Sequence, residues 1–265
     1  MKLHTLASGS EGNCLLVQSG QTRLLVDAGI STRRITAALS QLGLHPADIS
    51  AIVLTHAHTD HVSALATWTR RYDTPLYASA ATASQIVQRA ACAAPRLHTV
   101  SVPDSLALGS VTLRFFPTAH DAWGSMACRI DGADGSIGVL TDTGYVTAEA
   151  QGALTGADLL VLESNHDVEM LRCGPYPEPL KARILGPYGH LSNETAARFA
   201  VEMAASGTRE IVLAHLSREN NTPSLALETV ARALRAADQE SCRVSVAPRC
   251  QLSGCYEVEV TSCRK

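Results

Sequence analysis

The sequence has no Cys-x-x-Cys pair, no long apolar run and no strong excess of charge, and each absence excludes a class of protein. Its eight cysteines are scattered along 265 residues. We therefore expect them to be reduced and mostly buried, not paired in disulfides or held in a sulfur-rich zinc site. The net charge of −3 at pH 7 gives no global basic field, so a nucleic-acid partner would have to bind a local patch.

No stretch approaches the length of a membrane span, and residues 1–5 lead into Gly and Ser without the apolar core of a signal peptide. We therefore expect no membrane partner and a cytoplasmic location. No linker, low-complexity tract or internal repeat divides the chain, which predicts that residues 1–265 form one domain.

The apolar pattern predicts a mixture of helices and strands. Residues 14–18 and 22–26, joined by Ser19-Gly20-Gln21, favour a hairpin, and residues 32–42 favour a helix that ends at Gly43. Other helices are expected over residues 63–71, 80–91, 147–154, 193–205 and 224–237, and other strands over 51–54, 111–115, 126–130, 137–140, 159–162 and 211–213 and near Leu76 and Leu97. This mixture favours a layered α/β arrangement that contains antiparallel sheet.

One hexapeptide, His56-Ala57-His58-Thr59-Asp60-His61, holds three imidazoles and a carboxylate directly after an apolar run. On an extended backbone His56 and His58 project to one side, and a bend beyond them would aim Asp60 and His61 at a second ion. Imidazole beside carboxylate suits zinc, manganese or iron. The alternative is a solvated loop in which histidines happen to cluster.

Three later residues follow predicted strands in the same way as His56: His120, Asp142 and His215. A single His or Asp after a strand is more often a loop or capping residue. Their shared position at strand ends favours a set of metal ligands that rigid elements aim at one place.

These seven residues resemble the HxHxDH motif and the later His, Asp and His of the metallo-β-lactamase-fold hydrolase superfamily. The resemblance implies an αββα sandwich, in which helices flank two mixed sheets, with two divalent ions (zinc or manganese, with iron as a further candidate) at the sheet edge. His56, His58 and His120 would hold one ion, Asp60, His61 and His215 the other, and Asp142 would bridge them. Two close cations lower the pKa of a shared water toward neutrality and supply hydroxide as nucleophile, which Asp60 can orient or deprotonate.

Two further segments bear on which bond is cut. The segment around His190 resembles the His-Ser-Thr element of tRNA 3′-processing phosphodiesterases, with Ser192 or Asn193 as a helix N-cap. Glu163 occupies the place of the acid that accompanies that histidine. Because an alkoxide leaving group benefits from a proton, His190 is a candidate general acid and Glu163 its orienting partner. Alternatively, Glu163 caps a turn and His190 is a surface loop residue.

The whole chain resembles the YycJ-like (WalJ-like) branch of that superfamily, on residues 8–14, 163–171, 189–194, 213–217 and 219–221. The resemblance implies an exonuclease that degrades double-stranded DNA in the 5′ to 3′ direction with manganese or zinc. A chain of this length has no room for an inserted nucleic-acid-binding domain, so the core itself would grip DNA. The candidate substrate contacts are Asn165 and His166 in the pocket and, against phosphates, Lys181, Arg183, Arg172, Arg33 and Arg34. Instead of lining the pocket, His166 could lie behind the metal ligands or pack beneath the loop. The basic residues could instead be solvated surface charges.

Three other functions remain open. A thioester or lactone hydrolase of the glyoxalase II type would share the ligands but would not need His190, because thiolate is a good leaving group. A diiron oxygen reductase typically has Glu in place of His58 and a flavin domain, and a binding protein would keep the metal for stability alone. The sequence also leaves open which metal is native, whether the substrate is DNA or RNA, and in which direction it is cut. The oligomeric state is open too, and a homo-oligomer is one of the alternatives.

Overall fold

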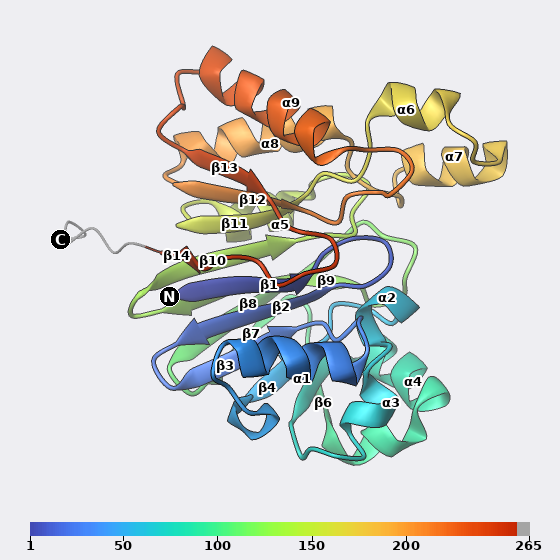
Figure 1. The fold of residues 1–265 in the computed structure, drawn as a ribbon, viewed down its shortest axis with the longest axis vertical. Coiled ribbons are helices and arrows are strands. Elements are labelled where there is room, and N and C mark those ends of the chain that lie inside the picture. The colour runs from blue at the N-terminus through green and yellow to red at the C-terminus, as the bar shows by residue number, and fades with distance from the viewer. Residues whose placement is uncertain (259–265) are drawn as a thin grey trace.

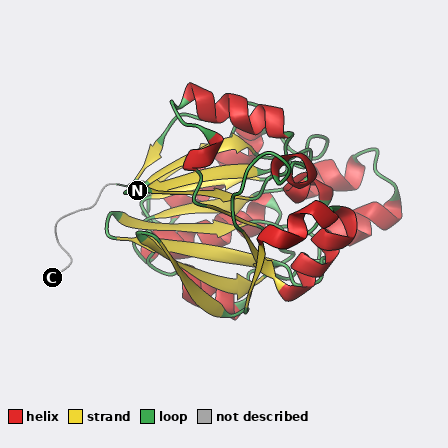
Figure 2. Cartoon of the chain, turned by 90° about the horizontal axis from the view of Figure 1, so that it is seen from below, coloured by secondary structure: helices red, strands yellow, loops and turns green. Residues whose placement is uncertain are grey.

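Two seven-stranded β-sheets pack face to face, and helices cover the outer face of each (Figures 1 and 2). The computed structural model describes residues 1–258. The first sheet has the order β14-β1-β2-β3-β4-β5-β6 and the second β13-β12-β11-β10-β9-β8-β7. In chain order the strands are β1 (Lys2–Ala7), β2 (Cys14–Ser19), β3 (Thr22–Val26), β4 (Ala51–Val53), β5 (Leu76–Ser79), β6 (Leu97–Val100), β7 (Asp104–Leu108), β8 (Val111–Pro117), β9 (Met126–Gly132), β10 (Gly135–Leu140), β11 (Leu159–Glu163), β12 (Glu210–Ala214), β13 (Arg243–Val246) and β14 (Tyr256–Glu257).

Both sheets are mixed. In the first, the strands from β14 to β3 pair antiparallel and those from β3 to β6 pair parallel. In the second, β7 to β10 pair antiparallel and β10 to β13 pair parallel. The predicted αββα sandwich of two mixed sheets flanked by helices is confirmed.

The helices lie on the two outer faces and at one end of the sandwich. They are α1 (Thr32–Gln41), α2 (Thr59–Val62), α3 (Leu65–Trp68), α4 (Ala80–Arg89), α5 (Ala148–Leu154), α6 (Val168–Cys173), α7 (Glu178–Leu185), α8 (Asn193–Ala205) and α9 (Pro223–Ala236), with short 3₁₀ turns at Pro46–Asp48 and Ala91–Arg96. One apolar cluster fills the space between the sheets. A second packs α1, α3 and α4 against the first sheet, and a third packs α5, α8 and α9 against the second.

Local sequence signals explain the best-predicted elements. The β2–β3 hairpin turns at Gly20, whose φ of 53° suits glycine. The side chain of Ser31 caps α1 by accepting a hydrogen bond from the backbone N–H of Arg34, and the helix gives way to Gly43 at φ 70°. The prediction of α8 over residues 193–205 is confirmed at both ends.

Two expectations are wrong in detail. The helix predicted over residues 63–71 is shorter than expected, because only Leu65–Trp68 is helical there, and a separate short helix, Thr59–Val62, precedes it inside the histidine motif. The break comes at Ala64, whose N–H donates to the carbonyl of Ala28 on the neighbouring loop. The cysteines of residues 1–258 are free, but fewer are buried than expected, because Cys173, Cys250 and Cys255 are exposed and Cys92 is partly exposed. Cys263 lies outside the described residues.

The carboxyl ends of the parallel strands in both sheets meet at one edge, and α6 and α7 stand off the body beside it (Figure 1). Loops that leave β3, β4, β10, β11 and β12 therefore converge there, which is where ligands bind in open α/β sheets. Within residues 1–258, no helix has the length and apolar character needed to cross a bilayer.

Candidate metal centre

The histidine motif is held by backbone hydrogen bonds between three loops. The Asn13 N–H donates to the carbonyl of Asp60 at 2.8 Å, the Gly29 N–H to Asn13 at 2.8 Å, and the Ala28 N–H to His61 at 2.8 Å. Gly29 allows this close approach, because a Cβ built on it would stand 1.6 Å from the Asp60 carbonyl oxygen. The motif is therefore fixed by backbone contacts that do not depend on its own side chains.

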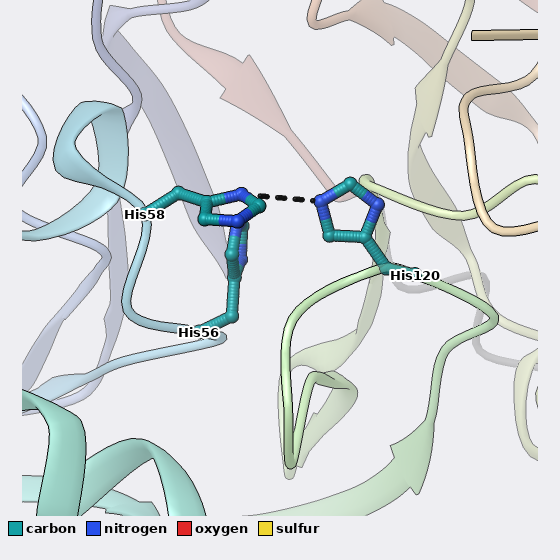
Figure 3. A group of neighbouring side chains, drawn as sticks. All are labelled: His56, His58 and His120. Atoms are coloured by element: carbon teal, nitrogen blue, oxygen red, sulfur yellow. Dashed lines mark hydrogen bonds between the residues drawn. The ribbon is translucent and has the colours of Figure 1, made fainter. Parts of the chain in front are cut away.

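Three imidazoles form a first group at the sheet edge. His56 and His58 come from the loop after β4, and His120 comes from the turn between β8 and β9; the three point toward one another (Figure 3). One nitrogen from each lies within 4.8 Å of the others, and His58 Nδ1 is 3.3 Å from His120 Nε2. The structure thus brings together the three residues predicted to share one ion.

Asp60, His61 and His215 form a second group, again with one ligand atom each within 4.8 Å of the others. Asp142 lies between the two groups. Its Oδ2 is 3.4 Å from His61 Nε2, and its Oδ1 is 3.5 Å from His215 Nε2 and 3.9 Å from His120 Nε2. Asp142 therefore has the position that a bridging carboxylate requires.

Hydrogen bonds at the far side of three rings, those of His61, His215 and His120, fix which nitrogen faces the centre. His61 Nδ1 donates to Asp27 Oδ2 at 2.7 Å, His215 Nδ1 to Glu163 Oε1 at 2.8 Å, and His120 Nδ1 to the Gly189 carbonyl at 3.3 Å. In each case Nε2 is left to face inward, where it could bind a metal.

The donor set fits divalent cations. It consists of five imidazoles and two carboxylates, a combination suited to zinc, manganese or iron. Two of its atoms, His56 Nε2 and Asp142 Oδ2, are buried with no hydrogen-bond partner among residues 1–258. A buried polar atom without a partner is costly, and a bound cation would satisfy both.

Three acidic and imidazole residues of the centre have left-handed backbones directly after or near strand ends: Asp27 (φ 62°), Asp142 (φ 56°) and His215 (φ 57°). This region is sparsely populated by residues other than glycine and costs about 1–3 kcal/mol each. The surrounding strands hold these backbones in the left-handed conformation. That conformation directs all three side chains toward one site.

Asp27 and Thr55 are functional candidates that the sequence reasoning missed. Thr55 Oγ1 donates to the Asp27 carboxylate at 2.9 Å and lies 3.0 Å from His56 Nδ1, so Asp27 supports both His56 and His61. Asp27 directly follows β3. The strand-end signal that identified Asp142 would have found it.

Glu163 lies fully buried beneath the centre and accepts four hydrogen bonds. Its Oε1 accepts from Nδ1 of His190 and Nδ1 of His215, each at 2.8 Å, and its Oε2 accepts from the N–H groups of Thr143 (3.2 Å) and Leu191 (3.0 Å). Burial disfavours its charge, but His190 and His215 overcome that effect and lower the pKa of Glu163 to about 2. Burial likewise lowers the pKa of His190, but the Glu163 carboxylate outweighs it and the net pKa is raised.

Charges inside the centre are strongly coupled. Burial opposes ionisation of Asp142, yet His215 and His61 hold the pKa of its carboxyl well below the usual range. Burial also opposes protonation of His215, but Asp142, Asp60 and Glu163 raise its pKa to about 10. Asp142 and Asp27 raise the pKa of His61 in the same way. In the metal-free protein these carboxylates therefore favour the protonated form of both imidazoles.

A cavity of about 210 Å³ opens over the centre. His58, Asp60, His120, Asp142, His190 and His215 line its polar side, and Asn165 and Arg183 also reach it. Arg183 Nε is bonded to the carboxylate of Asp121, which follows His120. Two predicted substrate contacts, Asn165 and Arg183, are thus placed beside the metal ligands.

The other predicted substrate contacts lie elsewhere. Among residues 1–258, those that line the cavity do not include Lys181 or His166. Lys181 donates to the Arg172 carbonyl at 2.8 Å and to Glu178 at 2.9 Å. His166 is 1% exposed, and burial lowers its pKa to about 4. Arg34 donates to the carbonyl of Cys250. Lys181 is thus engaged on its own helix and the preceding one, and His166 is buried away from the cavity lining.

Comparisons with known proteins agree with this geometry. The family model described as a beta-lactamase superfamily domain matches residues 22–216. The chain is 39% identical over 237 residues to a Bacillus anthracis protein named exodeoxyribonuclease YycJ, covering 88% of this chain and 90% of that protein. It is 37% identical over 240 residues to exodeoxyribonuclease WalJ of Streptococcus pneumoniae, covering 89% of each. The metallo-beta-lactamase fold protein YhfI of Bacillus subtilis superposes with a TM-score of 0.72 at 20% identity, covering 97% of this chain and 98% of that one.

Proposed function

The chain belongs to the metallo-β-lactamase superfamily of metal-dependent hydrolases, and from this premise we propose that it is an exonuclease that hydrolyses double-stranded DNA. The relatives named exodeoxyribonucleases support the proposal, because each is matched along most of its length. The observation that carries it is the Glu163–His190 pair. Its 2.8 Å hydrogen bond orients an imidazole beside the metal ligands, where a leaving oxygen would need a proton.

His56, His58 and His120 would hold one divalent ion, and Asp60, His61 and His215 a second, with Asp142 between them. When bound, the two ions would supply an acidified water and positive charge around the phosphate. Zinc and manganese both suit this donor set.

Asp60 and His190 would move the protons. Asp60 is 24% exposed at its side chain, lines the cavity and accepts a hydrogen bond from Asn13 Nδ2 at 3.3 Å. These contacts support a role in which Asp60 would orient the attacking water and take its proton. As the water oxygen bonds to phosphorus, the bond from phosphorus to the sugar oxygen breaks, and His190 would donate its proton to that oxygen.

Asn165 and Arg183 would position the strand. The Asn165 side chain donates to the His215 carbonyl at 2.9 Å, so it is fixed to the metal loop while reaching the cavity. Arg183 carries positive charge to the same cavity, where it would pair with a backbone phosphate.

The proton-donor role of His190 is tested by varying the leaving group. With manganese-loaded protein, His190→Ala should slow hydrolysis of DNA by roughly 10²–10⁴-fold. The same variant should hydrolyse bis(p-nitrophenyl) phosphate nearly as fast as wild type, because nitrophenolate leaves without a proton. Equal loss on both substrates would contradict a leaving-group acid.

A thioester substrate run in parallel separates the alternative function. Turnover of the thioester that is unaffected by His190→Ala, with no hydrolysis of DNA or of the phosphodiester by wild type, would sink the nuclease proposal. It would make the protein a small-molecule hydrolase of the glyoxalase II type.

A further inference from the structure

One wall of the cavity is apolar and aromatic, in contrast to the histidines and carboxylates opposite. Four residues spaced by four positions form this wall: Tyr176, Leu180, Ile184 and Tyr188. Leu180 and Ile184 lie one turn apart on α7, so they share a face of that helix. Tyr188 is 60% exposed. Exposed apolar surface beside a charged site is typical of a binding site for a ligand that has an apolar face.

Backbone contacts tie this wall to the reacting groups. The His190 N–H donates to the carbonyl of Ile184 at 3.1 Å, and the Gly189 carbonyl accepts from His120 Nδ1 at 3.3 Å. A Cβ on Gly189 would stand 2.1 Å from the Ile184 oxygen, so the approach is too close for any other residue. A group bound against the wall is therefore held at a fixed place relative to His120 and His190.

Charge at the rim of the wall suits a phosphate. Arg183 precedes Ile184 and is paired with Asp121, whose Oδ1 lies 3.4 Å from His120 Nε2. The cavity thus offers an apolar surface on α7 and, from the same helix, the Arg183 guanidinium, which its pairing with Asp121 holds beside the candidate metal ligands. A nucleotide has the matching chemistry, a base with apolar faces linked to an anionic phosphate.

The cavity is small and partly open to solvent, with a volume of about 210 Å³. The proposed occupant is one unpaired nucleotide rather than a whole base pair. An end nucleotide that enters must first leave its partner strand, at a cost that is smallest for mismatched ends.

We propose that the wall of Tyr176, Leu180, Ile184 and Tyr188 stacks the base of the terminal nucleotide, so that the DNA end unpairs before hydrolysis. This inference rests on the proposed nuclease function. Tyr188 is the principal stacking residue, because it combines an aromatic ring with exposure at the cavity.

Calorimetric binding to metal-loaded protein tests the stacking directly. The probes are 2′-deoxyadenosine 5′-monophosphate and 2-deoxyribose 5-phosphate, which differ by the base. Wild type should bind the nucleotide more tightly, and Tyr188→Ala should reduce that preference by roughly 5- to 100-fold. Tyr145→Ala is the matched control, since Tyr145 is 49% exposed and is not among the described residues that line the cavity; it should keep the full preference. Equal or undetectable binding of the two probes to wild type would overturn the proposal.

End-labelled duplexes with a paired or a mismatched terminal base pair test the nuclease function and the stacking wall separately. Wild type should degrade the mismatched end faster. If wild type degrades neither duplex, the nuclease function fails. If it degrades both equally and Tyr188→Ala behaves like Tyr145→Ala, the nuclease function stands and the stacking wall is wrong.

Discussion

Glu163 links the two chemical parts of the site. One of its oxygens accepts hydrogen bonds from both His190 and His215, so a candidate proton donor and a candidate metal ligand share a single anchor. Its other oxygen is fixed by two backbone N–H groups. The sequence suggested the contact with His190, but the contact with His215 depends on how β11 and β12 pair, which no local pattern reveals.

Glu163→Gln should impair both functions of this anchor. A glutamine offers one acceptor oxygen to four donors, so its NH₂ group must face an N–H. We expect metal affinity or DNA hydrolysis to fall about 10–100-fold, as for other residues that orient metal ligands, measured by metal titration and by nuclease assay. Glu169→Gln changes a carboxylate that is 79% exposed and should alter neither. Unchanged metal affinity and rate in Glu163→Gln would refute the anchoring role.

Metal binding should release protons at pH 7. Without metal, the neighbouring carboxylates raise the pKa of His215 to about 10 and also raise that of His61, so both favour the protonated form. Both must lose that proton to ligate, which predicts roughly two protons released on full loading. Calorimetric titration in buffers of different ionisation enthalpy measures this number. A heat that is independent of the buffer would contradict the assignment of both ligands.

At the scale of elements, the site depends on how loops interlock at strand ends. The loops after β1, β3 and β4 bond to one another through Asn13, Ala28 and Gly29, and they enclose Asp60 and His61. Backbone hydrogen bonds position this loop. Residues 56–61 can therefore present four candidate ligands although their first half has no regular secondary structure.

Gly29→Ala tests this interlock. The new Cβ would stand 1.6 Å from the Asp60 oxygen, so the histidine loop must move. We expect the free energy of unfolding to fall by about 1–3 kcal/mol and metal affinity to fall as well. Gly152→Ala is the control, because nothing lies within 4 Å of its Cβ position in α5, and it should stabilise by about 0.5–1 kcal/mol. Equal behaviour of the two variants would show that the loops are not tightly interlocked.

The same elements show how far the sequence alone could go. Strong apolar periodicity and caps placed the β2–β3 hairpin, α1 and α8 within one or two residues. The edge strand β7 escaped prediction, since its residues are largely exposed and lack a buried stripe. Positions at strand ends and the family resemblance identified the seven candidate ligands that converge at the sheet edge, but not Asp27 and Thr55 behind them. The sequence did not predict a role for Asp121 or for the aromatic cavity wall, because both depend on contacts between α7 and the β8–β9 turn.

At the scale of the whole molecule, the metal centre joins the two sheets. His56, His58, Asp60 and His61 follow β4 of the first sheet, while His120, Asp142 and His215 follow strands of the second. Each proposed ion would take ligands from both sheets. Since the sheets also share one apolar cluster, we infer that residues 1–258 form a single domain; the last seven residues of the predicted span 1–265 lie outside the described residues.

Metal should therefore stabilise the entire fold. At a free metal concentration of 100 times Kd, each site that binds the native state should raise the free energy of unfolding by about 2.7 kcal/mol. Calorimetry of protein with manganese or zinc, against protein treated with a chelator, measures the change in Tm. Asp142→Asn, which alters the residue between the two groups, should reduce the metal-dependent rise. A Tm that does not respond to metal would contradict a centre shared by the two sheets.

The central claim is that this metal centre cuts DNA from its ends. The most direct measurement follows end-labelled duplex DNA incubated with manganese-loaded wild-type protein and with an Asp60→Ala/His61→Ala variant. Stepwise shortening by wild type that is absent in the variant is the predicted result. An intact duplex with wild type, or equal shortening by both proteins, would contradict the account.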